Sequence, residues 1–341
     1  MRQIIINQIN SYKNHDKPLT NLKVVVDAGN GSGGFITKEI LEPLGAVTQG
    51  SINLEPDGNF PDHEPNTESI SAIKSLQKQV IETDADLGII FDSDADRCAF
   101  VNNEGKPILH DNFVALLTTI VAEENTKPTI VTDSITSDDL SNFIQKELGG
   151  IHHRFKRGYR KVINEAIRLN NDGINCPLAI ETSGHAAFKD NNFMDDGVLL
   201  AAKVIIKLAN IKHKGQTTIS EFYSRYSTSK VTMQFRLRIL SQNIETESNR
   251  IIQTFKQFSD TIPGWKVVIN NFDGIRISAD KFFGDGWLLL RLSLHEPVLV
   301  LNIESGSKRG MMMILKRAVK LLSRITSVNI STLNTYIEVN Q

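Results

Sequence analysis

The chain has 341 residues, enough for two or three domains of ordinary size. Apolar residues make up 40% of it and charged residues 23%, which is typical of a soluble globular protein, and no segment approaches the roughly 20 apolar residues of a membrane span. The formal net charge of -1, without a long block of one sign, argues against a nucleic-acid-binding protein, which would carry a basic stripe.

Strand and helix patterns alternate over the first 125 residues. Short buried strands are predicted at residues 23–27, where a glycine-rich turn follows, and at 86–91. A hairpin of residues 98–101 and 106–109 is predicted around an Asn-Glu-Gly turn. Helices are predicted at residues 37–44, 67–82 and 111–124. This alternation indicates a doubly wound, mainly parallel sheet.

The same alternation returns after a linker at residues 125–128. Strands are predicted at residues 129–132 and 178–181, and helices at 137–148, 158–169 and 195–209. After about Ser229 the pattern changes to grouped strands with few helices, which indicates an α+β domain on an antiparallel sheet. Its strands are predicted at 231–240, 266–269, 274–278, 287–293 and 298–304, and its helices at 247–258 and 309–323.

The predicted fold class is therefore α/β: two tandem α/β domains with mainly parallel, mixed sheets, followed by an α+β domain with an antiparallel sheet. The expected boundaries are an N-terminal remnant at residues 1–20, then domains at 21–125, 126–228 and 229–341.

An acidic loop, Asp92-Ser93-Asp94-Ala95-Asp96-Arg97, directly follows the strand at 86–91. Ligands gather at the carboxyl ends of strands in open α/β sheets, and alternate carboxylates on a tight loop favour a hard cation, Mg²⁺ or Ca²⁺. An EF-hand is excluded, because Arg97 and Asn103 stand where that loop needs glycine and a carboxylate. A solvated acidic turn is the remaining alternative. The buried strand and the adjacent arginine favour a cation site that neutralises a phosphoryl group.

A glycine loop follows the first strand. Gly29, Gly31 and Gly34 satisfy the G-x-G-x-x-G pattern of dinucleotide-binding proteins, and Glu55 is roughly where such proteins place an acid. Two features argue against that interpretation: Asp27 stands where pyrophosphate would approach, and a long loop at residues 56–61 interrupts the βαβ unit. We therefore favour glycines used for tight packing, and keep a nicotinamide-dependent enzyme as the minor alternative.

Four segments in order resemble the α-D-phosphohexomutases, the family of phosphoglucomutase, phosphomannomutase and phosphoglucosamine mutase. They are residues 24–33 (VVVDAGNGSG), 60–66 (FPDHEPN), 92–97 (DSDADR) and 181–185 (ETSGH). The resemblance extends from about residue 20 to the end of the chain. It implies an isomerase that moves phosphate between the 1 and 6 positions of a hexose phosphate through a hexose bisphosphate, with Mg²⁺ and a phosphoserine of the family's first domain.

The resemblance also implies roles for particular residues. Asp92, Asp94 and Asp96 match the Mg²⁺ ligands, and Arg97 would steady the phosphoryl group. His185 would assist proton transfer or orient the substrate. The substrate-binding set comprises Glu181 and Ser183 for sugar hydroxyls, and Arg160 as a basic contact, for which a surface arginine is an equal alternative.

The family's phosphate-binding loop corresponds to residues 291–300, RLSLHEPVLV. Arg291, Ser293 and the Glu-Pro pair match the family pattern. His295 replaces a threonine, Val300 replaces the final arginine, and Leu294 replaces a small residue. His295 would still offer a hydrogen-bond donor, and a charge when protonated. Phosphate affinity and sugar selectivity are therefore expected to depart from the family pattern.

The resemblance further calls for a phosphoserine domain before the strand at 23–27, whereas residues 1–22 contain no such loop. Three explanations stay open: a truncated product or incomplete gene model, a separate phosphoserine-bearing polypeptide, or a non-catalytic sugar-phosphate-binding or regulatory paralogue. We expect impaired activity without that domain.

Cysteine use and the N-terminal sequence bear on location. Cys98 and Cys176 lie far apart in sequence, which argues against a disulfide framework or a cysteine zinc site and favours a reducing compartment. Residues 1–18 carry neither a signal-peptide core nor the Arg/Ser bias of a transit peptide. We expect a cytoplasmic location, with an organelle stroma as the open alternative.

Overall fold

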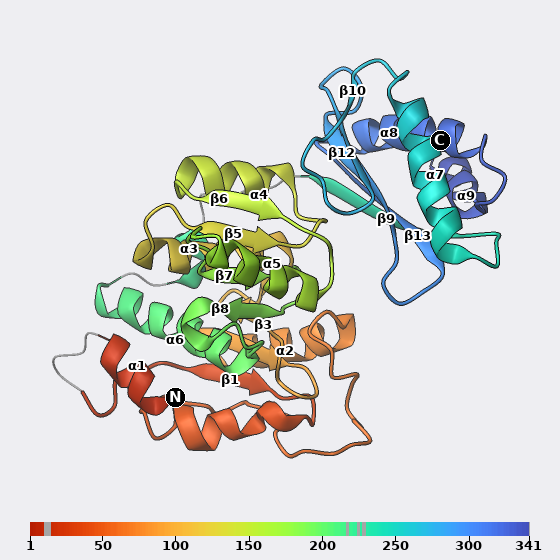
Figure 1. Ribbon diagram of the computed structural model, residues 1–341. Coiled ribbons are helices and arrows are strands. Elements are labelled where there is room, and N and C mark those ends of the chain that lie inside the picture. Colours follow the sequence, from red (N-terminus) through yellow and green to blue (C-terminus); the bar gives the residue numbers. More distant parts are fainter. Residues whose placement is uncertain (10–14, 216–217, 224–225, 227–229, 341) are drawn as a thin grey trace. The chain divides into compact units, whose positions relative to one another are not determined.

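The computed structural model describes residues 1–9, 15–215, 218–223, 226 and 230–340 (Figure 1). The chain divides into two compact units, which are described separately below. The first consists of Met1–His153 with Tyr159–Tyr226, and the second of Arg154–Gly158 with Ser227–Gln341. None of the helices in the described part of the chain is long and apolar enough to span a lipid bilayer.

The first sheet of the first unit has the strand order β1-β2-β3-β4. Its strands are Val24–Asp27, Leu87–Phe91, Cys98–Asn102 and Pro107–Ile108. The pair β1–β2 is parallel, and β2–β3 and β3–β4 are antiparallel. Every residue of β1, β2 and β3 is buried, which explains their continuous apolar runs. Helix α2 (Ile70–Thr83) covers one face with a regular apolar stripe.

The second sheet of this unit has the order β6-β5-β7-β8. These strands are Ile151–Arg154, Thr129–Thr132, Leu178–Ile180 and Ala186–Phe188. The pair β5–β7 is parallel and β7–β8 is antiparallel. The accompanying helices are α4 (Asp138–Asn142), which continues as the π-helix η3 (Phe143–Glu147), and α5 (Tyr159–Asn171).

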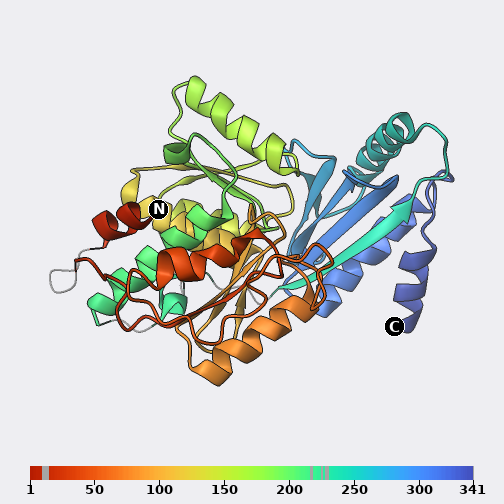
Figure 2. The ribbon, with the colours of Figure 1, turned by 90° about the horizontal axis from the view of Figure 1, so that it is seen from below.

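Two further helices connect the sheets into one core. Helix α3 (Asp111–Glu124) contacts β7, and α6 (Gly197–His213) contacts both α3 and β3 (Figures 1 and 2). Both helices carry buried residues in nearly unbroken succession, as expected of helices enclosed on all sides. A single apolar cluster therefore contains residues of both sheets together with both helices.

Strands β6 and β8 were not predicted from the sequence, and two features near the N-terminus also differ from the prediction. A helix was predicted at residues 37–44, but the structure has the 3-10 turn η1 (Ser32–Gly34) and the π-helical turn η2 (Thr37–Leu41). Helix α1 (Arg2–Gln8) was not predicted, and it lies in the expected N-terminal remnant. It buries Ile5 in the main core, and Asn210 of α6 donates a hydrogen bond to its last carbonyl, that of Gln8, at 3.1 Å.

Two 3-10 turns complete the first unit: η4 (Lys189–Asn191) follows β8, and η5 (Ile219–Tyr223) packs against α3.

The second unit is an antiparallel sheet with helices on one face. Its strand order is β10-β11-β12-β13-β9, and every pair is antiparallel. The strands are β9 (Val231–Arg238), β10 (Trp265–Val267), β11 (Ile275–Ala279), β12 (Gly286–Leu292) and β13 (Val298–Ser305). Helices α7 (Ile244–Ser259), α8 (Lys308–Leu322) and the unpredicted α9 (Ser331–Val339) share one apolar core with the sheet. The predicted fold class, two mixed sheets followed by an antiparallel one, is confirmed.

Candidate functional site

The acidic loop lies between β2 and β3, at the carboxyl end of β2. Asp92 is buried, Asp96 is partly buried and Asp94 is exposed. One carboxylate oxygen from each of the three lies within 4.8 Å of the others. Ala95 adopts φ 59°, and its backbone N–H donates to the Asp92 carbonyl at 3.3 Å. This left-handed residue folds the loop back on itself, so that alternate carboxylates converge.

Arg97 holds Asp92 at both carboxylate oxygens. Its Nε donates to Oδ2 at 2.8 Å, and its backbone N–H donates to Oδ1 at 3.1 Å. The same guanidinium lies farther from Asp96, with Nε 3.8 Å from Oδ1. Arg97 therefore fixes the first aspartate of the loop, whatever further contact it makes with a ligand.

Asp96 is the least satisfied carboxylate of the group. Its Oδ1 is buried and accepts no hydrogen bond from the residues the structure describes. Burial, and then the negative charge of Asp92, raise the pKa of Asp96 to about 7. A bound cation would relieve both effects, since it would supply the missing positive charge and a partner for the free oxygen. The donor set, three carboxylates from one loop, fits a hard divalent cation.

The glycine loop packs directly against the acidic loop. A Cβ on Gly31 would lie 2.6 Å from the carbonyl oxygen of Ser93, which leaves no room for a side chain. The neighbouring Ser32 N–H donates to that same carbonyl at 2.9 Å. Asp27 faces inward, where His63 Nε2 lies 2.9 Å from its Oδ2. The glycine thus serves close backbone approach, which favours the packing interpretation over dinucleotide binding.

The segment 181–185, called the sugar loop below, connects β7 to β8. Glu181 and Ser183 are both buried, and the Ser183 hydroxyl donates to Glu181 Oε2 at 3.4 Å. Gly184 has φ 101°, and a Cβ on it would lie 2.9 Å from the carbonyl oxygen of Cys98. An isolated antiparallel bridge pairs His185 with Arg97. The structure therefore brings the acidic loop and the sugar loop together, although about 90 residues of sequence separate them.

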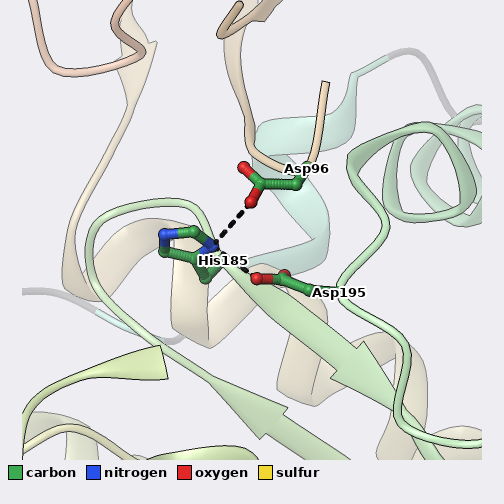
Figure 3. A group of neighbouring side chains, drawn as sticks. All are labelled: Asp96, His185 and Asp195. Atoms are coloured by element: carbon green, nitrogen blue, oxygen red, sulfur yellow. Dashed lines mark hydrogen bonds and ion pairs between the residues drawn. The ribbon is translucent and has the colours of Figure 1, made fainter. Parts of the chain in front are cut away.

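His185 points toward two carboxylates (Figure 3). Its Nδ1 lies 2.6 Å from Asp195 Oδ2 and 3.9 Å from Asp96 Oδ2. Burial lowers the pKa of His185, but the hydrogen bond to Asp195 and the charges of Asp195 and Asp96 outweigh burial and raise it above the ordinary value. Asp96, His185 and Asp195 form a second group of possible metal ligands within 4.8 Å of one another.

Sequence reasoning missed Asp195. The sequence signal was the pair of acids Asp195-Asp196 at the start of a predicted helix. A helix start needs only one capping acid, and Asp196 fills that role, because its side chain accepts from the Leu199 N–H at 2.9 Å. The second acid, Asp195, could therefore have been proposed as a site residue.

Tyr159 connects two of the predicted site residues. Its ring stacks on the His185 imidazole with centroids 4.8 Å apart and an interplanar angle of 17°. Its hydroxyl accepts a hydrogen bond from Arg160 Nε at 3.0 Å. Arg160 itself is exposed. Tyr159 was not predicted as a site residue, because an aromatic residue at a helix start carries no functional signal by itself.

The predicted phosphate-binding residues lie in the second unit, in and beside the β12–β13 hairpin. Arg291 is buried on β12, and its Nε lies 3.9 Å from Asp273 Oδ2. The Ser293 N–H donates to the Val298 carbonyl at 2.9 Å and so closes the hairpin. His295, at the tip, is exposed. Val300 pairs with Arg291 in the strand register, so an apolar side chain stands beside this arginine.

A short segment ahead of α5 belongs to the same unit. The Phe155 ring lies 5.2 Å from that of Phe272, and the Arg157 N–H donates to Asp273 Oδ2 at 3.4 Å. Asp273 thus has both Arg157 and Arg291 as neighbours.

Family models match most of the first unit. Residues 3–105 match the model described as phosphoglucomutase/phosphomannomutase, alpha/beta/alpha domain II. Residues 110–228 match the model of alpha/beta/alpha domain III of the same family. The acidic loop lies in the first match and the sugar loop in the second.

Curated relatives carry related names. A phosphomannomutase/phosphoglucomutase of Pseudomonas syringae is 32% identical over 288 residues, which cover 84% of this chain and 57% of the relative. A phosphomannomutase of Methanocaldococcus jannaschii is 30% identical over 294 residues, or 85% of this chain and 59% of the relative. The chain spans less than two thirds of the length of either protein.

Solved structures share the fold. A phosphoglucomutase/phosphomannomutase family protein of Burkholderia thailandensis superposes with a TM-score of 0.76 at 27% identity, covering 95% of this chain and 64% of the other. N-acetylphosphoglucosamine mutase of Aspergillus fumigatus, crystallised with GlcNAc-6P and magnesium, gives a TM-score of 0.61 at 13% identity, with 94% and 68% covered.

Proposed function

This chain belongs to the phosphohexomutase superfamily, and from that premise we propose that it binds a hexose phosphate with Mg²⁺ and takes part in moving a phosphoryl group between the 1 and 6 positions of the sugar. The names of its relatives, phosphomannomutase/phosphoglucomutase, support an isomerase. The observation that carries the proposal is the pairing of Arg97 with His185, which sets three convergent carboxylates beside a loop suited to sugar hydroxyls.

Asp92, Asp94 and Asp96 would hold the Mg²⁺. The unpartnered Asp96 Oδ1 and the raised pKa of Asp96 support this assignment, because both describe a site built for a positive charge. The fungal enzyme that shares this fold holds magnesium and a sugar phosphate together. When bound, the ion would offset the negative charge of the phosphoryl oxygens. Arg97 keeps Asp92 in place for that ion.

The sugar loop would bind the hexose. Glu181 and Ser183 face the same side and offer a carboxylate and a hydroxyl, which suit adjacent sugar hydroxyls. His185 Nε2 is turned away from Asp96 and Asp195, so it is the nitrogen available to a substrate hydroxyl (Figure 3). Arg160, held by Tyr159, would contribute a positive charge. Arg291, Ser293 and His295 of the second unit would bind the phosphate that is not transferred.

Full turnover needs a phosphoryl carrier. We include in the proposal a phosphoserine-bearing domain as the partner that carries the phosphoryl group. The boundaries 21–125, 126–228 and 229–341 are proposed as the superfamily's second, third and fourth domains. The matched family models of domains II and III cover residues 3–105 and 110–228.

A second candidate is a non-catalytic sugar-phosphate-binding paralogue. The observation that favours it is the altered phosphate loop, where Val300 stands beside Arg291 and the exposed His295 occupies the tip. Such a protein would keep the metal and sugar sites and bind without turnover.

Binding and turnover assays separate these candidates. Thermal shift and calorimetry would measure binding of Mg²⁺ and glucose 1-phosphate, and a coupled assay would follow glucose 6-phosphate formation with Mg²⁺ and glucose 1,6-bisphosphate. The assay is run on the chain alone and with a phosphoserine domain in trans. Turnover in either case supports the mutase, and binding without turnover supports the paralogue. If neither Mg²⁺ nor the sugar phosphate binds, both candidates fail.

A further inference from the structure

Thr182 separates the two residues proposed to bind the sugar and points the other way. Glu181 and Ser183 meet on one side of the loop, with Ser183 Oγ 3.4 Å from Glu181 Oε2. Thr182 Oγ1 instead donates a hydrogen bond to Asp133 Oδ2 at 2.8 Å. Thr182 is 5% exposed and Asp133 is fully buried. The middle residue of the loop is therefore hydrogen-bonded to the end of β5, while its two neighbours contact each other on the other side of the loop.

The sheet brings Asp133 to this position. Thr132 of β5 pairs with Ile180 of β7 in parallel register, so the residues that follow the two strands emerge side by side at their carboxyl ends. The Asp133 backbone is itself fixed, because its carbonyl accepts hydrogen bonds from the hydroxyls of Thr132 at 3.2 Å and Thr136 at 3.1 Å. Asp133 thus belongs to the rigid end of the sheet, and the sugar loop is tied to that end.

The carboxylate of Asp133 depends on this one contact. Its Oδ1 is buried and accepts no hydrogen bond from any described residue, and Thr182 is the donor on Oδ2. Burying a carboxylate with few hydrogen-bond donors costs free energy. Losing the hydrogen bond from Thr182 would raise that cost further, so this bond is strongly favoured. The second tie on the loop, from Thr67 Oγ1 to the Ser183 carbonyl at 3.1 Å, holds the backbone but does not set which side Thr182 faces.

We propose that Asp133 and Thr182 are positioning residues of the sugar site: their hydrogen bond fixes the orientation of the sugar loop and so presents Glu181 and Ser183 together to the hexose hydroxyls. This inference rests on the proposed function, in which that pair grips the sugar. Neither residue touches the ligand. The two loops meet at the Arg97–His185 bridge, but Arg97 also holds Asp92 directly, so we expect Mg²⁺ affinity to depend much less on the Asp133–Thr182 bond than sugar affinity does.

The test compares Thr182→Val, which keeps the shape and removes the donor, with Thr182→Ser, which keeps the hydroxyl. Calorimetry measures the Kd of glucose 1-phosphate and of Mg²⁺ for each full-length variant. We expect T182V to weaken glucose 1-phosphate binding about tenfold and Mg²⁺ binding less than about twofold, and T182S to remain within about threefold of wild type for both. Equal weakening of both ligands, or unchanged sugar binding in T182V, overturns the inference.

Hydrogen exchange supplies a readout that needs no ligand. Exchange at the amides of residues 182–185 should accelerate in T182V and not in T182S, while exchange in α2 stays unchanged. If wild type binds no hexose phosphate, the proposed function fails, and unchanged exchange in T182V then overturns the positioning role separately. Should T182V not fold, the double variant Asp133→Leu with Thr182→Val removes the buried charge together with its donor. It is expected to show the same faster exchange, and normal exchange there counts against the inference.

Discussion

At the scale of single residues, the acidic loop is strained by its own charge. Asp92 has both oxygens satisfied by Arg97, whereas Asp96 has a buried oxygen without a hydrogen-bond partner in the described structure and a pKa raised to about 7. We therefore expect the loop to lower the stability of the metal-free protein, and a bound cation to restore it. Such a site makes the metal-free protein less stable and raises its affinity for a cation.

Replacing Asp96 with Asn should change stability in opposite directions with and without metal. Without Mg²⁺, removing the buried charge should raise the melting temperature by about 2 °C. With millimolar Mg²⁺, the variant should lose the stabilisation that wild type gains, because a ligand is gone. Differential scanning calorimetry at both conditions measures this. Asp84→Asn is the matched control, because Asp84 is almost fully exposed and should change neither value. An undiminished Mg²⁺ response in D96N would refute the assignment.

His63 forms a buried pair with Asp27 that should respond to pH. Its Nδ1 lies 3.0 Å from the Glu64 carbonyl oxygen and its Nε2 lies 2.9 Å from Asp27 Oδ2. Both partners are hydrogen-bond acceptors, which favours the doubly protonated form of the ring. Burial lowers the pKa of His63, but the Glu64 carbonyl, Asp27 and the charge of Asp62 outweigh it and raise the pKa above 6.5. The stabilisation is thus complete below pH 6.5 and is lost as the pH rises through the folded-state value.

Urea unfolding at pH 6 and pH 9 tests this pair. The free energy of unfolding of wild type relative to His63→Gln should fall by about 1.5 kcal/mol between the two values, near the lower end for a buried hydrogen bond to a charged group. His15→Gln is the control, since His15 is 73% exposed, and its curve should run parallel to wild type. A constant difference between wild type and H63Q across this range would show that His63 is not charged in the folded state.

At the scale of elements, the conformation of the acidic loop depends on the glycine loop that packs against it. The glycine loop after β1 lies against the acidic loop after β2, because the two strands are parallel neighbours and their carboxyl ends meet. The Ser93 carbonyl lies close to the Gly31 backbone and accepts from the Ser32 N–H. The glycine loop therefore supports the geometry of the acidic loop, although it supplies none of the three carboxylates.

Gly31→Ala should displace the acidic loop and so weaken the proposed cation site. The new Cβ would lie 2.6 Å from the Ser93 carbonyl oxygen, so the acidic loop must move. Overpacking of this kind typically costs about 1–3 kcal/mol, and the displaced aspartates should bind Mg²⁺ at least about tenfold more weakly. Gly58→Ala is the control, because a Cβ there meets nothing within 4 Å. Calorimetric Kd values for the two variants decide the matter, and equal Kd values would mean that the glycine loop does not support the site.

At the scale of the whole molecule, features that depend on neighbouring residues in the sequence could be predicted, and features that depend on distant residues could not. The buried strands and the hairpin were predictable from apolar runs and turns, because those patterns lie within a few residues. Asp133, Tyr159 and Asp195 were not, because each acts through a partner that only the fold brings near. The acidic and sugar loops were predicted separately, but their contact through Arg97 and His185 needed the structure.

The sharing of one core by both sheets was also outside the reach of the sequence. Alternating strands and helices predicted two α/β domains. The apolar character of the helix predicted at residues 195–209 was visible in the sequence, but the elements that enclose α3 and α6 were not. A helix with apolar residues all round has no free face, so it cannot serve as the outer layer of an independent domain. The two matched family domains, residues 3–105 and 110–228, therefore share one apolar core.

Fragments of the chain test this conclusion. Residues 1–125 alone lack α6, which contacts β3 and packs with α1, so this fragment should show no cooperative thermal transition and should bind the dye ANS. Residues 1–226 contain the whole first core and should unfold cooperatively and keep Mg²⁺ binding within about threefold of the full chain. Residues 227–341 have a core of their own and should also fold alone. A cooperative transition for 1–125 would mean that the shared core is dispensable, and the two α/β halves would then be independent after all.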